Sequence, residues 1–143
     1  MLSADVNVFV YAHRRDTARH PEHKAWLEDR LSGPEPFGVS ELVLSSFVRI
    51  VTNHRIFQEP TDPGEALAFC SAVRAAPAAI PLRPGPAHWP IFADLCRQVG
   101  ARGNVVPDAY LAALAIEHGA AWVTSDTGFR RFRGLRVHPP LER

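Results

Sequence analysis

Long hydrophobic runs and cysteines are scarce in this sequence. No apolar run approaches the roughly 18 residues that a membrane-spanning helix needs. The first residues, Met-Leu-Ser-Ala-Asp, lack the basic segment and long apolar stretch of a secretory signal. The two cysteines, Cys70 and Cys96, are far apart in helix-like settings. They could pair, but lone cysteines among apolar residues are more typical of a reduced core. We therefore expect a cytoplasmic protein.

Lysine is almost absent and the net charge is small. Lys24 is the only lysine, so arginine supplies nearly all the positive charge, and the formal net charge is +1. Arginine binds phosphate with two hydrogen bonds and stacks on bases, which suits nucleic acid. A GC-rich genome gives the same bias, so arginine usage alone decides nothing about partners.

The length and composition indicate one globular domain spanning residues 1–143. Hydrophobic residues make up 46% and charged residues 22% of the chain, which is the balance of a folded domain. Short apolar segments alternate with helical patterns, and this alternation predicts an α/β fold with a mostly parallel sheet covered on both faces. The expected strands are 1–5, 36–39, 78–82, 121–124 and 135–137, and the expected helices are 21–31, 41–51, 64–75, 86–99, 107–119 and a short piece at 129–132.

The sequence leaves one segment ambiguous and marks the starts of two helices. The run Val6–Ala12 is apolar and rich in β-branched residues, so strand and helix both remain open there. Ser40 is a predicted N-cap, and Pro107 suits the first position of a helix.

Four acidic residues follow predicted strands or open predicted helices. Asp5 and Asp126 each follow a strand, whereas Glu41 and Asp108 lie in first helical turns. The carboxyl ends of parallel strands meet at one edge, where ligands bind, so the four acids are expected to converge there.

Each acid also has a purely structural explanation. Glu41 and Asp108 would complement a helix dipole, and Asp126 would cap a turn. Asp5 is harder to explain, because it lies in an apolar segment where a buried charge needs a partner. Clustered carboxylates repel one another unless a cation or raised pKa values relieve them. All-oxygen ligation favours Mg²⁺ or Mn²⁺ over zinc.

The sequence resembles PIN-domain ribonucleases, and within them the toxins of VapBC toxin–antitoxin pairs. The matching segments are Asp5-Val6-Asn7, Ser40-Glu41-Leu42, Pro107-Asp108-Ala109-Tyr110-Leu111-Ala112 and Thr124-Ser125-Asp126-Thr127-Gly128-Phe129. Their order and the chain length follow the family over nearly the whole sequence, although residues 60–103 carry no matching motif. Relatives often carry a further charged residue where Thr127-Gly128 stands.

The resemblance implies a PIN-like three-layer sandwich whose five parallel strands have the order 3-2-1-4-5. It implies Asp5, Glu41, Asp108 and Asp126 as the catalytic acids, with Asp5, Asp108 and Asp126 as metal ligands. Asn7 and Thr124 would orient the carboxylates or water. One or two Mg²⁺ or Mn²⁺ ions would activate water and neutralise phosphate charge during RNA hydrolysis.

Two arginine clusters are weaker candidates for substrate binding. His13, Arg14 and Arg15 follow the first apolar run, and Arg130, Arg131 and Arg133 follow Asp126. Near the active edge they would hold RNA phosphates; elsewhere they are ordinary surface.

Two alternative functions are compatible with some of these residues. A haloacid-dehalogenase-like phosphatase also has an aspartate after its first strand, but it needs a second acid where Asn7 stands. A non-catalytic PIN-like module binding RNA or protein is a further alternative. The resemblance also implies a small DNA-binding antitoxin, and a homodimer formed through the apolar stripes of 21–31 and 42–51.

Overall fold

Five short strands form one parallel sheet in the computed structural model, which describes residues 1–142. The order is β3-β2-β1-β4-β5, and each neighbouring pair is parallel. The α/β class and the order 3-2-1-4-5 are therefore confirmed. The strands are β1 (Leu2–Ala4), β2 (Phe37–Val39), β3 (Ala79–Pro81), β4 (Ala121–Val123) and β5 (Val137–His138).

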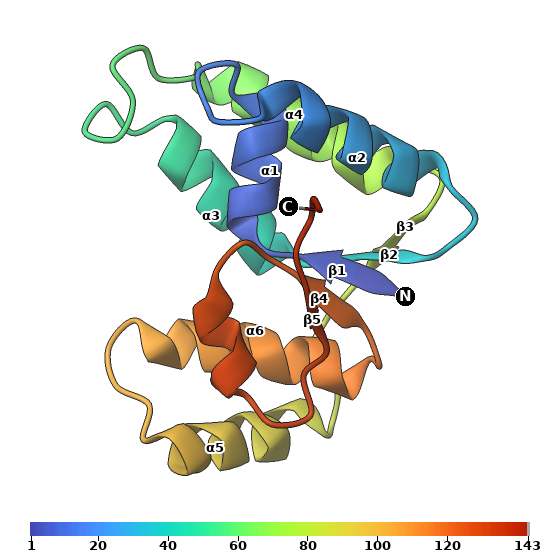
Figure 1. Ribbon diagram of the computed structural model, residues 1–143, viewed down its shortest axis with the longest axis vertical. Helices are drawn as coiled ribbons and strands as arrows, with labels where there is room; N and C mark the ends of the chain where they lie inside the picture. The colour runs from blue at the N-terminus through green and yellow to red at the C-terminus, as the bar shows by residue number, and fades with distance from the viewer. Residues whose placement is uncertain (143) are drawn as a thin grey trace.

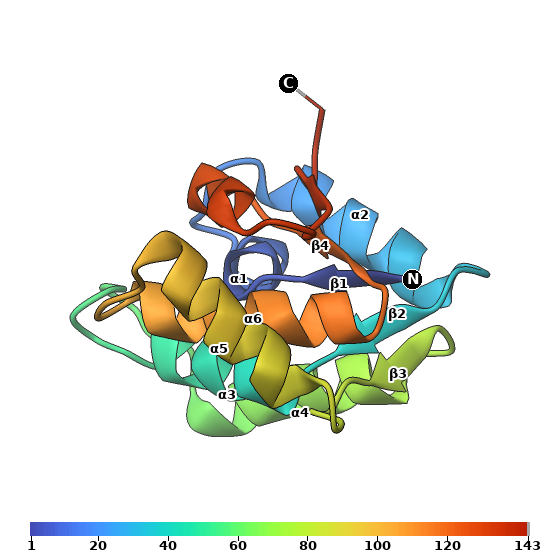
Figure 2. The same cartoon turned by 90° about the horizontal axis from the view of Figure 1, so that it is seen from below.

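Helices cover both faces of the sheet, which becomes the middle layer of three (Figures 1 and 2). In Figure 1, α1 to α4 lie above the sheet, and α5 and α6 lie below it. The helices are α1 (Val6–His13), α2 (His20–Ser32), α3 (Glu41–Val51), α4 (Pro63–Ala75), α5 (His88–Val99), α6 (Val105–Glu117) and the 3₁₀ helix η1 (Thr127–Arg131).

The core lies on both sides of the sheet because its central strands are buried and mostly apolar; the exception, Ser3 on β1, donates its hydroxyl to the Ala121 carbonyl. Phe37 on β2 and Val123 on β4 are buried, and Phe9 and Phe47 pack over the sheet from α1 and α3. Strands covered on both faces need such continuous apolar runs. Gly38 lies so close to Leu82 that a Cβ there would be 2.5 Å from its side chain.

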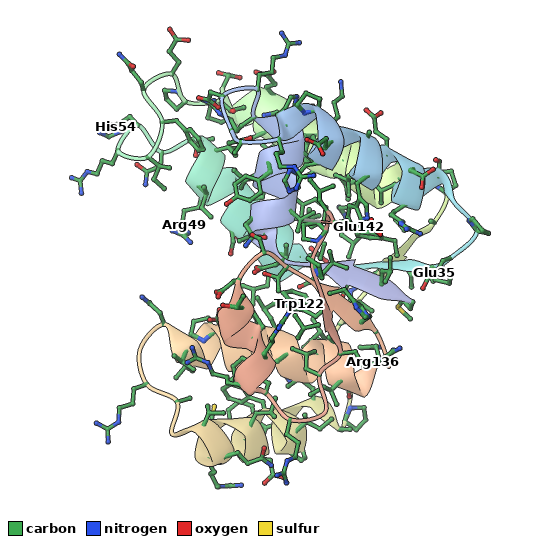
Figure 3. The ribbon with its side chains drawn as sticks, viewed as in Figure 1. Glu35, Arg49, His54, Trp122, Arg136 and Glu142 are labelled. Atoms are coloured by element: carbon green, nitrogen blue, oxygen red, sulfur yellow. The ribbon has the colours of Figure 1, made fainter. Side chains whose placement is uncertain are left out.

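Trp122 extends from β4 to the side of the sheet that carries α6 and η1 (Figure 3). Its ring lies 5.4 Å from that of Phe129, and this contact holds η1 against the sheet. Arg49 and His54, by contrast, point outwards from α3 and the loop after it (Figure 3). The contact between Trp122 and Phe129 anchors β4 on the face of the sheet that α6 covers.

Local boundaries differ from the sequence predictions in a few places. Val6–His13 is a helix, and Asp5 caps it by accepting a hydrogen bond from the Val6 N–H. Ser40 stands at the N-cap of α3, but its hydroxyl makes no capping bond. Helix α6 begins at Val105 rather than at Pro107, because a proline anywhere in the first turn removes only an N–H that has no partner within the helix.

The two cysteines do not form a disulfide with each other. Cys70 and Cys96 are both free, and Cys70 is buried. Its thiol contributes to the core beside α3, and burial raises its pKa. Within residues 1–142, no helix combines the length and the apolar character that crossing a membrane requires.

Candidate active site

Asp5 is held at the end of β1 by hydrogen bonds from the adjacent Val6 and from Thr124, which is distant in the sequence. The β1–β4 register pairs Ala4 with Val123, so Asp5 and Thr124 leave the sheet side by side. The Thr124 hydroxyl donates to Asp5 Oδ2 at 2.7 Å, and the Val6 N–H donates to Asp5 Oδ1 at 2.7 Å. Asp5 is only 6% exposed. A buried carboxylate is thereby fixed in orientation, with unused lone pairs on each oxygen.

Thr124 is the centre of the polar contacts around Asp5. Its Oγ1 also accepts a bond from the Asp126 N–H at 3.0 Å. The Asn7 Nδ2 lies 3.5 Å from the same oxygen, at the limit of a hydrogen bond. Asn7 and Thr124 therefore lie beside the carboxylates they were expected to orient, and that role itself stays a prediction.

Two further acids reach the same edge of the sheet from other elements. Asp126 follows β4 and caps η1, where its Oδ1 accepts the Gly128 N–H at 2.8 Å. Asp108 lies in the first turn of α6. Figure 1 shows the start of α1, the β4–η1 loop and the first turn of α6 at one edge of the sheet. The carboxyl ends of the strands form this edge, as expected for a parallel sheet.

The pKa values show that the three acids share one electrostatic environment. Burial, together with the charges of Asp5 and Asp126, raises the pKa of Asp108 to about 6, although Arg131 lowers it. Burial also raises the pKa of Asp5; its bonds from Thr124 and Val6 oppose the rise, and Asp126 adds to it. The site therefore holds more negative charge than it can stabilise alone, which is the condition that a bound cation relieves.

The donor set fits a hard divalent cation, although the side chains are not closed around one. Among residues 1–142, no three His, Cys, Asp or Glu side chains are arranged so that they could hold a metal ion as placed. The buried Asn7 Oδ1 has no hydrogen-bond partner, so an acceptor beside Asp5 and Thr124 stays available to an ion's water shell. Mg²⁺ commonly keeps several waters and uses few protein carboxylates, which matches an open group of this kind.

Glu41 does not join the other three acids. It begins α3, where its carboxylate lies 3.8 Å from Arg83, and its side chain is 66% exposed. It lines a separate hollow beside β3, together with Ile80. The expectation that all four acids converge is thus not met for Glu41, because its side chain faces the edge strand β3 rather than β1 and β4.

Arg14, the middle residue of the first basic cluster, is built into the scaffold of the protein. Arg14 donates to the Asp16 carboxylate, to the Glu59 carbonyl at 2.7 Å and to Thr61 at 3.2 Å. Its guanidinium also lies over the Phe57 ring. Arg14 therefore ties the end of α1 to the loop before α4, and its donors are used internally. Its role in phosphate binding stays a prediction.

His13 and Arg15 lie at the same end of α1. The His13 ring contacts Phe47 and Phe69, its Nε2 lies 3.2 Å from the Thr61 hydroxyl, and burial lowers its pKa. Arg15 is exposed. Both residues line a hollow of about 840 Å³ between α1, α2 and α4, which none of the four acids lines. Their contact with RNA stays a prediction.

The second basic cluster lies beside the acids. Arg131 is close enough to Asp108 to lower its pKa, and its Nε donates to the Gly128 carbonyl at 2.8 Å. Arg130 lines a different hollow, of about 490 Å³, which Asp126 also lines. We call this second space the C-terminal hollow. It is formed by residues 124–127, the start of α2, part of α1 and the tail after β5.

Several residues of the C-terminal hollow carry no signal in the sequence. Tyr11 reads as part of an apolar run, Arg19 and His23 as helix-start residues, and Pro139 to Leu141 as a tail. Only the fold brings them to Asp126. A pattern based on strand ends cannot find residues that reach the edge from helices or from the tail.

The chain is similar to the PIN domain family and to proteins named VapC ribonucleases. Residues 4–135 match the PIN domain family model. Ribonuclease VapC43 of Mycobacterium tuberculosis is 49% identical over 142 residues, which cover 99% of this chain and 97% of the relative. Ribonuclease VapC25 of the same organism is 42% identical over 142 residues, covering 99% and 100%.

Solved structures share the fold at low sequence identity. VapBC2 from Rickettsia felis, bound to a DNA fragment from its promoter, matches with a TM-score of 0.69 and 19% identity over 96% of this chain and 97% of that chain. VapC20 of Mycobacterium tuberculosis, a sarcin-ricin loop cleaving toxin, matches with a TM-score of 0.64 and 18% identity over 95% and 99%.

Proposed function

Because the chain belongs to the PIN-domain family, in which its full-length relatives are VapC ribonucleases, we propose that it hydrolyses RNA phosphodiester bonds at the edge formed by Asp5, Asp108 and Asp126. The observation that carries the proposal is the meeting of three carboxylates from three distant elements, with the pKa of Asp108 raised to about 6 by burial and by the other two. A charge cluster of this kind is costly for stability, and function is the usual reason for its presence.

The expected cofactor is Mg²⁺ or Mn²⁺, held by Asp5, Asp108 and Asp126. When bound, such an ion supplies positive charge that activates water and stabilises the developing charge on phosphate. The oxygen-only donors and the open geometry support a hard ion that keeps part of its water shell. The identity and number of ions belong to this proposal.

The chain's own residues would prepare the site in defined ways. Thr124 fixes the Asp5 carboxylate and, through the Asp126 N–H, the loop that carries the third acid. Asn7 presents a buried acceptor at the same place. Arg131 balances part of the charge beside Asp108 and would contact a substrate phosphate there.

Cleavage of labelled RNA by the purified protein tests the proposal. Asp5→Ala and Asp108→Ala are expected to lower the rate at least about 100-fold while the melting curve stays cooperative, since even residues behind metal ligands contribute about 10- to 100-fold. Asp94→Asn removes an exposed charge on α5, away from the site, and serves as the control. Full activity in EDTA or in either alanine variant would contradict the proposal.

A Glu41→Gln variant decides between the sequence prediction and the structural placement. We expect a loss below about tenfold, because the Glu41 carboxylate pairs with Arg83 at the surface. A loss as large as that of Asp5→Ala would return Glu41 to the catalytic group.

A toxin role with a neutralising partner follows from the same relatives. The VapBC structures contain a toxin with its antitoxin, one of them on promoter DNA. We infer a small DNA-binding antitoxin as the partner, and RNA as the substrate of the free toxin. Co-expression with the product of the adjacent reading frame should abolish cleavage and restore growth. Growth arrest that persists with a bound partner would contradict this role.

A homodimer is the expected assembly. Leu42 on α3 is 45% exposed, which supports the predicted stripe at 42–51. The stripe at 21–31 is less favourable, since none of its large apolar residues is among the exposed ones in residues 1–142. Leu42→Asp should convert the dimer to a monomer in light scattering, and a monomeric wild type would contradict the assembly.

The alternative function is a PIN-like module that binds without catalysis. The presence of all three clustered acids argues against this alternative. Binding of Mn²⁺ and RNA without cleavage of the RNA would support it. The cleavage assay above separates the two functions directly.

A further inference from the structure

The C-terminal hollow adjoins the three acids and has the size of a small-ligand site. Its volume is about 490 Å³, and Thr124, Ser125 and Asp126 form one of its walls. Pockets that bind small molecules have volumes of roughly 300–1,000 Å³. Anything held in this hollow therefore lies next to a substrate phosphate at the acids.

Other lining residues of the hollow carry rings and apolar side chains. The rings of Tyr11 and His23 lie 5.0 Å apart at 57°, and Pro140 and Leu141 come from the tail after β5. Figure 2 shows this tail leaving the sheet on the side where α2 and η1 lie. A hydrogen bond from Arg19 Nη1 to the Glu142 carbonyl, at 3.2 Å, ties the tail to the start of α2. Unstacked RNA bases bind on surfaces of this kind.

A cation at the rim adds a contact for phosphate. Arg130 and Arg131 are consecutive in a 3₁₀ helix, where successive side chains point about 120° apart. Arg131 faces Asp108, whereas Arg130 lines the hollow. Arg19 is occupied by Glu22 and the tail, but Arg130 makes no ion pair or side-chain hydrogen bond with another residue of the described chain, 1–142. Its guanidinium is thus available to a ligand.

We propose that the C-terminal hollow binds one nucleotide of the RNA, adjacent to the cleaved phosphate, with its base against Tyr11 and a phosphate on Arg130. This inference rests on the proposed ribonuclease function. A nucleotide matches the combination of ring surface, cation and direct continuity with Asp126. A segment of a protein partner is the competing occupant, but the cation at the rim and the shared wall with the acids favour RNA.

Binding without cleavage provides the first test. The whole protein is titrated against a fluorescein-labelled RNA hexanucleotide of random sequence in EDTA. Arg130→Ala should weaken binding about tenfold, the loss of one charge-assisted phosphate contact. The control is Arg30→Ala, an exposed arginine in the last turn of α2, about 16 Å along the helix from Arg19. It should change affinity less than about twofold.

Tyr11 provides the second test. Tyr11→Phe keeps the ring and should bind RNA like the wild type, whereas Tyr11→Leu should lose about fivefold or more through lost base stacking. Melting curves of both variants establish that each is folded. With Mg²⁺ present, Arg130→Ala should raise KM more than it lowers kcat, since it removes binding rather than chemistry.

The outcomes separate this inference from the proposed function. If the wild type binds RNA but never cuts it, while Arg130→Ala binds more weakly, the nuclease function fails and the hollow stands. If the wild type cuts RNA and Arg130→Ala binds and cuts RNA as Arg30→Ala does, nucleotide binding in the C-terminal hollow is wrong and the ribonuclease function is supported. Weakened antitoxin binding with unchanged RNA binding would assign the hollow to the protein partner and overturn the inference.

Discussion

Replacing Asp108 by asparagine should stabilise the metal-free protein near neutral pH. Burial and the charges of Asp5 and Asp126 raise the pKa of Asp108 from 3.8 to about 6. At about 1.4 kcal/mol per pKa unit, ionising Asp108 in the folded state costs up to about 3 kcal/mol. Asp108 is partly exposed, so we reduce this value to about 1–1.5 kcal/mol for solvent screening.

The sign of the pH dependence follows from the raised pKa. The cost is absent below the unfolded pKa, near 4, and grows as the pH rises towards about 6, above which it stays constant. In EDTA at about pH 8, Asp108→Asn should therefore melt about 2–6 °C higher than the wild type, and the difference should shrink towards about pH 4.5. Mg²⁺ should stabilise the wild type and not the variant.

Thermal unfolding in EDTA across this pH range measures the effect. Asp94→Asn is the matched control, because Asp94 is an exposed acid on α5 whose pair with Arg97 is at the surface. A variant Asp108→Asn that melts below the wild type, or by a difference independent of pH, would refute the electrostatic account of the site.

Two other changes test the scaffold of the site. Thr124→Val should lower the unfolding free energy by about 1–3 kcal/mol and cleavage by about 10- to 100-fold, because buried Asp5 loses its hydroxyl donor; Thr124→Ser should retain most of both, and an active Thr124→Val would remove Thr124 from the site. Arg14→Ala should cost about 2 kcal/mol in chemical denaturation through its lost bonds to Glu59 and Thr61. Arg15→Ala is its exposed control; a weaker RNA affinity at unchanged stability would instead make Arg14 a substrate contact.

Much of the fold is predictable from the sequence because the spacing of apolar residues and the residues that end helices indicate the same elements. The alternation of short apolar strands with three-turn helices indicates the α/β class, and Gly100 and Gly119 end helices in left-handed conformations that glycine adopts freely. The run after Asp5 is different. Its β-branched residues leave strand and helix open, and the outcome depends on the cap that Asp5 provides and on burial between neighbouring helices.

The site is predictable in part for the same reason. Asp5 and Asp126 follow strands, and strand ends in a parallel sheet meet at one edge. Glu41 satisfies the same rule, yet its side chain turns to Arg83 at the β3 edge, because a position at a strand end does not determine the direction of a side chain. Arg14 likewise belongs to a basic cluster in the sequence, but its side chain is buried and bonded to the loop before α4.

The pairing of β1 with β4 has a consequence for synthesis of the protein. Asp5 precedes its hydroxyl partner Thr124 by 119 residues, and the acid Asp126 comes just after Thr124. During synthesis, Asp5 is therefore made long before β4 and stays without its partner until β4 has been made. The three acids come together only when β4 enters the sheet beside β1, so the pairing of these two strands also assembles the site.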